Sequence, residues 1–157
     1  MLHDDLLSQA NALISLDKRR PRQSNLRRAV STAYYAVFHA LGHHVARQMI
    51  GSSKKDDELR ALLRRALEHS EMKSTLRGFA GGNPSLIYRD ALGGRKVPVS
   101  LQRIAAVFVD LQEKRHLADY DLSTTYAKAT AQFAVNDAAE AVGLLQDLTA
   151  RDPENCA

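Results

Sequence analysis

The chain has 157 residues, of which 45% are hydrophobic, and a formal net charge of +4. This length suffices for one domain that buries roughly two thirds of its unfolded surface, so stability requires neither a metal nor a disulfide. The sequence contains one cysteine, Cys156, which excludes a disulfide framework and a cysteine-based zinc site.

The first residues show neither a signal peptide nor a membrane segment. Asp4 and Asp5 precede a short stretch of Leu and Ala, and no window approaches the roughly 20 apolar residues of a membrane span. We therefore expect a cytoplasmic protein with no membrane partner. Residues 1–150 are predicted to form a single domain, and residues 151–157 a polar tail.

Apolar residues recur every three or four positions almost throughout, which predicts an all-α fold, a four- to five-helix up-and-down bundle. The first helix is expected over about 4–17, ahead of a basic run and a proline. The second is long, over about 24–49, and is closed by Gly51. A third is expected over 56–78, because three acids at its start favour the positive end of the helix dipole.

Residues 78–99 are predicted to be a loop, because glycines and prolines interrupt every regular pattern there. Loops of this length in a compact domain are usually functional or disordered. The fourth helix is expected to open after Ser100 and to carry Arg115 near its end. The fifth is expected to run from Ser123 or Thr124 to about Thr149.

Positive charge gathers in one short stretch, at Lys18, Arg19, Arg20, Arg22, Arg27 and Arg28. Such a cluster suits a polyanion such as a nucleic acid. Lysine and arginine also solvate the outer faces of most helical bundles, so the cluster permits nucleic-acid binding without requiring it.

The predicted second helix carries a polar and aromatic stripe. Its members follow one another by steps of three or four and therefore share one face: Arg28, Thr32, Tyr35, His39 and His43. We interpret the first four as candidate binding residues. The alternative is an aromatic face packed on a neighbouring helix with its polar groups hydrogen-bonded. A metal at the histidines is not expected, because no carboxylate or cysteine nearby completes a ligand shell. No glycine-rich phosphate loop follows a strand, and no cofactor is expected.

The end of the predicted fourth helix carries the candidate catalytic residues. Arg115 and Asp119 stand four apart, a spacing that allows an ion pair, and His116 and Tyr120 repeat the spacing one position later. An Arg near a helix C-terminus is also favoured by the dipole alone, which leaves a purely structural role open.

Two segments together resemble the HEPN superfamily of small all-α domains: AYYAVFH at residues 33–39 and RHLADY at residues 115–120. The resemblance covers about residues 4–150. It implies a homodimer in which the Arg-bearing helices of two protomers line a shared cleft. It also implies kinship with RNA-cutting toxins, which are frequently paired with a small nucleotidyltransferase as antitoxin.

The resemblance has one departure. Family members that cleave RNA usually carry an Arg that is followed, after four to six intervening residues, by a His. They use no metal. Arg115 has no such His. The spacing from Arg64 to His69 fits, but it lies outside the motif, and we interpret it as chance.

Two functions therefore stand side by side. One is a metal-independent endoribonuclease, in which Arg115 stabilises the phosphate and Asp119, His116, Tyr120 or His39 moves protons. The alternative is a non-catalytic module that binds RNA, a nucleotide or a partner protein. A third, plainer interpretation is a structural bundle whose polar stripe is a satisfied interface.

Overall fold

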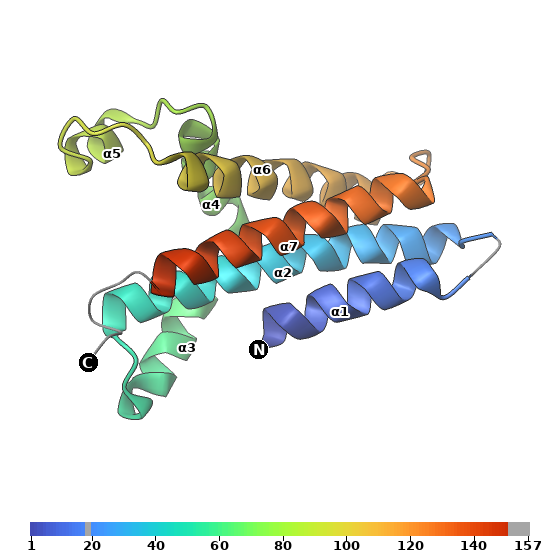
Figure 1. Ribbon diagram of the computed structural model, residues 1–157, viewed down its shortest axis with the longest axis horizontal. Helices are drawn as coiled ribbons and strands as arrows, with labels where there is room; N and C mark the ends of the chain where they lie inside the picture. Colours follow the sequence, from blue (N-terminus) through green and yellow to red (C-terminus); the bar gives the residue numbers. More distant parts are fainter. Residues whose placement is uncertain (18–19, 151–157) are drawn as a thin grey trace.

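The computed structural model describes residues 1–17 and 20–150, with the backbone alone for residues 149 and 150. Within these ranges the chain forms seven α-helices, one short 3-10 helix and no strand (Figure 1). The helices are α1 (Leu2–Ser15), α2 (Gln23–Ile50), the 3-10 helix η1 (Lys54–Asp56), α3 (Asp57–Ala66), α4 (His69–Ala80), α5 (Leu86–Ala91), α6 (Val99–Tyr120) and α7 (Lys128–Ala150). The predicted all-α fold is confirmed. Lys18, Arg19 and the predicted tail with Cys156 lie outside the described residues.

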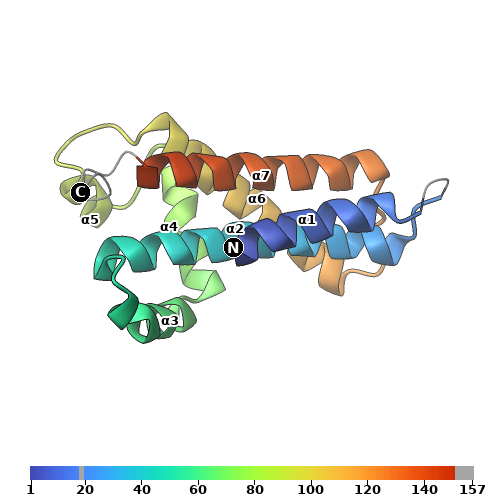
Figure 2. The same cartoon turned by 60° about the horizontal axis from the view of Figure 1, so that its bottom comes forward.

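Four long helices, α1, α2, α6 and α7, run alongside one another and alternate in direction, as an up-and-down bundle requires (Figures 1 and 2). The helix α2 contacts each of the other three. Outside this bundle, α4 packs against α6, and α3 lies beside the C-terminal part of α2. None of the described helices combines the length and the apolar character that crossing a membrane requires.

The core forms where these helices meet, and α2 is buried along much of its length. Small residues make this possible: Ala29, Ala33 and Ala36 are fully buried, so neighbouring helices approach the α2 backbone closely. Large side chains from several helices fill the remaining space, among them Ile14, Tyr34 and Phe108.

The end of α2 is fixed by a buried arginine. Gly51 adopts a φ of 85°, which ends the helix in a conformation that favours glycine. Arg60, which is 5% exposed, donates to the carbonyl oxygens of Gly51 and Ser53, both at 2.6 Å, and to Asp57 at 2.5 Å. These bonds hold α3 against the end of α2 and satisfy carbonyl groups of the turn that joins the two helices.

The long second helix is confirmed to within one residue at each end, but the third was predicted wrongly. Residues 56–78 do not form one helix: the chain breaks after Ala66, where Leu67 is extended with ψ at 121°. No glycine or proline marks this break. It reorients the chain so that α4 packs against α6 and places Leu76 in the core, while α3 remains beside α2.

The predicted loop at 78–99 and the predicted start of the last helix were also wrong in part. The loop contains α5, which is followed by Gly93 and Gly94, both with positive φ. The last helix begins at Lys128. Its start is delayed because Asp121 holds a turn by accepting hydrogen bonds from Ser123 and Thr124.

Candidate functional site

The last turn of α6 is fastened to α2 by Arg27. Its guanidinium donates to the carbonyl oxygens of Ala118 at 2.9 Å, Thr124 at 2.8 Å and Asp121 at 2.7 Å, and more weakly to Leu117 at 3.4 Å. A cation at this position satisfies terminal carbonyl groups and complements the helix dipole. Arg27 therefore fixes where the neighbouring polar side chains of α6 stand.

Arg115 and Asp119, one turn apart on α6, form the ion pair that their spacing predicts. Arg115 Nη1 lies 3.6 Å from Asp119 Oδ2, and the two side chains are 14% and 28% exposed. The hydroxyl of Ser31 on α2 donates a hydrogen bond to Asp119 Oδ1. The Arg115 guanidinium also lies over the ring of Tyr34, 5.3 Å from its centroid, in a cation–π contact.

One donor of Arg115 is unused. Its Nε is buried and has no hydrogen-bond partner among the described residues. A buried donor without a partner costs about 1–3 kcal/mol. The pairing of Arg115 with Asp119 therefore leaves the guanidinium incompletely satisfied.

A histidine from α4 completes the cluster. His69 Nδ1 lies 2.5 Å from the hydroxyl oxygen of Tyr34, and the imidazole stacks on Phe38 with the ring centroids 4.0 Å apart. Tyr35 meets the same imidazole edge-on at 6.0 Å. The hydrogen bond to Tyr34 engages Nδ1. In the tautomer whose Nδ1–H donates to the Tyr34 oxygen, Nε2 is the unprotonated ring nitrogen.

The surroundings set the protonation states. Burial lowers the pKa of His69, and the positive charge of Arg115 lowers it further. Burial raises the pKa of Tyr34 strongly, although Arg115 opposes this shift. At neutral pH the imidazole is therefore uncharged and able to accept a proton, while the phenol keeps its own proton.

Gln112 also helps to place His69. Its side-chain amide donates to the His69 backbone carbonyl at 3.0 Å, which ties the first residue of α4 to α6. Gln112 Oε1 is buried and unpartnered within the described part of the chain. The same glutamine thus fixes the backbone of His69 and leaves an acceptor unused nearby.

An open groove adjoins the cluster at Asp119. Its volume is about 620 Å³, and it lies between the start of α2 and the end of α6. The residues that line it are Leu13, Ser24, Asn25, Arg27, Arg28, Ala118, Asp119 and Leu122. Because Arg27 is engaged by backbone carbonyls, Arg28 is the exposed cation that this groove offers to an anion.

The other predicted site residues are placed less directly. Tyr35 contacts His69, and His39 stacks on Tyr35 with the centroids 6.5 Å apart. Thr32 is 5% exposed, which removes it from contact with a ligand in solution. His116 and Tyr120 are exposed and pack on one another with their rings 5.1 Å apart. Their predicted part in catalysis remains a prediction.

Sequence reasoning missed three members of the cluster: Ser31, Tyr34 and His69. Ser31, Tyr34 and Phe38 follow by three and four, so they share a face that a search for small and aromatic residues at helical spacing could have found. In the sequence His69 stands out only because its distance from Arg64 matches the Arg-to-His spacing of the family. That pair lies outside the family's motif. The partner of His69 in space is Arg115, 46 positions further along the chain.

Within residues 1–17 and 20–150 no group of three or more His, Cys, Asp or Glu side chains is arranged to hold a metal ion. Comparisons of the chain with known protein families, with curated proteins and with solved structures find no match. A function for this protein is therefore inferred from the geometry of the site itself.

Proposed function

We propose that this protein is a HEPN-like RNA-binding protein that cleaves the RNA backbone without a metal. One observation carries the proposal: a neutral imidazole, His69, stands in the same cluster as Arg115, with Tyr34 in contact with both. An arginine that can hold a phosphate and a base that can take up a proton are the two groups that such a cleavage needs.

The reaction class is transesterification. His69 Nε2 takes the proton of a ribose 2′-hydroxyl, and the 2′-oxygen attacks the adjacent phosphorus. The bond from phosphorus to the 5′-oxygen of the next nucleotide breaks, and that oxygen takes a proton from water. The hydroxide that remains takes the proton back from His69, which restores the neutral imidazole. The products are a 2′,3′-cyclic phosphate and a 5′-hydroxyl. The guanidinium of Arg115 stabilises the charge that develops on the phosphate oxygens.

The remaining residues bind and position. Asp119, held by Ser31, orients Arg115, and Tyr34 holds the imidazole of His69. Arg28 supplies a cation in the groove beside Asp119, where a flanking phosphate of a single strand fits. Such phosphate contacts make binding weaken as salt rises, with a slope near −0.7 for each phosphate neutralised.

The alternative is a non-catalytic module that binds RNA or a nucleotide, and one observation favours it. Asp119 already neutralises Arg115, and the side chain of Arg115 is only 14% exposed. If this pair never opens, Arg115 serves as a bridge within the bundle. From the HEPN resemblance, the proposal also includes that the protein forms a homodimer and pairs with a nucleotidyltransferase antitoxin.

The test is cleavage of end-labelled total RNA by purified protein in EDTA, with circular dichroism as the control for folding. Arg115→Ala is compared with Arg103→Ala, which removes another arginine of α6 that pairs with Asp137 and Glu140 on the surface. We expect the wild type and Arg103→Ala to cleave RNA. The cleavage rate of Arg115→Ala should be lower on the order of 100-fold or more. Salt-sensitive binding without any cleavage would instead establish the alternative.

A further inference from the structure

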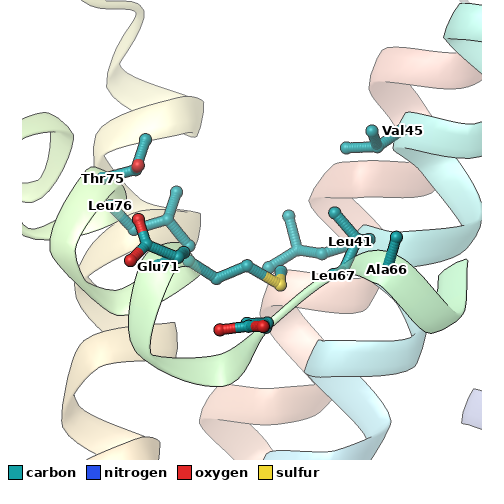
Figure 3. A pocket seen from close by; sticks show the side chains of 9 residues that line it. Leu41, Val45, Ala66, Leu67, Glu71, Thr75 and Leu76 are labelled. Atoms are coloured by element: carbon teal, nitrogen blue, oxygen red, sulfur yellow. The ribbon is translucent and has the colours of Figure 1, made fainter. Parts of the chain in front are cut away.

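A second cavity lies away from the proposed RNA site, between α2, the end of α3 and α4. Its volume is about 560 Å³. Figure 3 shows Leu41, Val45, Ala66 and Leu67 on one side, and Leu76, Thr75 and Glu71 on the other. Glu68 and Met72 also line it. None of these residues belongs to the Arg115 cluster, although Glu68 directly precedes His69 in the chain.

The cavity combines apolar walls with two carboxylates. Leu41 and Leu76 are mostly buried at 6% and 8% exposure and form its floor, while Glu68 and Glu71 are exposed at the start of α4. Within the described residues, neither carboxylate forms an ion pair. The positive end of α4 stabilises both carboxylates where they stand. An apolar cavity rimmed by unpaired negative charge complements a ligand that has an apolar part and a cationic group.

The size of the cavity indicates a small molecule. Its lining on α4 extends from Glu68 to Leu76, about 12 Å at 1.5 Å per residue. A partner helix needs anchors over at least two turns on both sides of a long groove. Here the α2 side contributes only Leu41 and Val45. The volume falls within the usual range of about 300–1,000 Å³ for small-molecule sites.

The wall nearest α2 is built by a close contact. A Cβ atom added to Gly42 would lie 3.3 Å from Leu67 Cδ1, so the leucine packs directly on the α2 backbone. Glycine inside a helix costs about 1 kcal/mol relative to alanine. At this position it allows the segment between α3 and α4 to approach α2 and shapes the cavity.

We propose that this cavity binds a small cationic amphiphile. The alkyl part lies against Leu41, Leu67 and Leu76, and the ammonium group lies at Glu68 and Glu71. The chemistry that defines the ligand is an apolar chain of limited length with one positive charge at its end. Aliphatic amines are the simplest members of this class.

Methionine methyl signals provide the readout, because the chain has three methionines and one of them, Met72, lines the cavity. Met1 and Met49 are 62% and 70% exposed and serve as internal controls. The full chain is labelled with ¹³C at the methionine methyl groups and titrated with butyl-, hexyl- and octylammonium. Octanol and octanoate are the matched neutral and anionic probes.

We expect octylammonium to shift the Met72 methyl signal saturably while Met1 and Met49 stay unchanged. Affinity should rise roughly fourfold for each added methylene until the chain fills the cavity. Octylammonium should bind most tightly, octanol less tightly and octanoate most weakly. Equal affinity for octanoate, equal shifts at all three methionines, or no shift at Met72 would overturn the proposal.

Two variants separate charge from shape. The double variant Glu68→Gln/Glu71→Gln should bind octylammonium on the order of tenfold more weakly than the wild type does. Its affinity for octanol should be unchanged. Ala66→Phe places a ring at the exposed edge of the cavity and should abolish the binding of both probes. Circular dichroism verifies that each variant folds. If the charge variant binds octylammonium as the wild type does, the assignment of the cationic group is wrong.

Discussion

Replacing Arg27 by methionine isolates the contribution of its guanidinium to the fold. Methionine keeps most of the apolar length of the side chain and removes three strong hydrogen bonds, at 2.7–2.9 Å, from the guanidinium to the end of α6 and the turn after it. At about 1 kcal/mol for each bond, the free energy of unfolding should fall by about 3 kcal/mol. In a chain of this size that lowers Tm by about 6–12 °C.

Urea denaturation followed by circular dichroism measures this change. The matched control is Arg28→Met at the next position, where the side chain is exposed and lines the groove. It should shift the free energy of unfolding by no more than about 0.5 kcal/mol. It should instead weaken RNA binding and reduce its salt dependence.

The two arginines should therefore separate stability from binding. Equal losses of stability in Arg27→Met and Arg28→Met would refute the assignment of Arg27 as the residue that fixes α6. Arg27→Lys provides a graded check. It keeps the charge but cannot reach several carbonyl oxygens at once, so it should lie between the wild type and Arg27→Met.

Three further outcomes are expected from the geometry. Tyr34→Phe removes the hydroxyl at His69 and should lower kcat for RNA with little change in KM, because Tyr34 is fully buried and touches no substrate. Single-turnover kinetics measure the split, and an effect on KM alone would contradict it. Gly42→Ala should raise the free energy of unfolding by about 0.5–1 kcal/mol, because Leu67 can move into the adjoining cavity. The branched side chain of Gly42→Val should instead lower it, and thermal melts of both variants measure the difference. Burial lowers the pKa of His43, so the folded state resists protonation, and stability should fall as the pH drops below about 6.5. In urea melts, His43→Gln should make the free energy of unfolding fall less steeply between pH 7 and 5. An unchanged pH profile would show that His43 does not contribute to the loss of stability.

The sequence predicted the bundle well where the signal is local. The bounds of α2 follow from its apolar spacing and from Gly51, whose positive φ ends the helix. The ion pair between Arg115 and Asp119 follows from spacing on one helix. These features depend on residues a few positions apart, which a pattern can reveal.

Features that depend on distant contacts were not predictable in the same way. The break at Leu67 carries no glycine or proline; it separates α3, which packs beside α2, from α4, which packs on α6. The choice between Tyr34 and Tyr35 depends on which helix covers which side of α2, and neighbouring positions differ by about 100° around a helix. The spacing from Arg28 selected Tyr35, whereas Tyr34 is the one beneath Arg115.

His69 shows why the site could be recognised only in part. Its contacts to Tyr34 and Phe38 join residues more than thirty positions apart, on helices whose boundary the sequence did not mark. A motif that requires the Arg and the His on one helix misses an arrangement in which α4 supplies the His. The fold, rather than the spacing, brings the two groups together.

The proposed cleavage depends above all on His69 acting as the base beside Arg115. Single-turnover cleavage of labelled RNA in EDTA by the wild type and by His69→Asn, with the product ends identified, measures this dependence. We expect cyclic-phosphate ends for the wild type and a loss on the order of 100-fold or more for the variant, while RNA binding is retained. Equal cleavage by the two folded proteins would show that His69 is not the base.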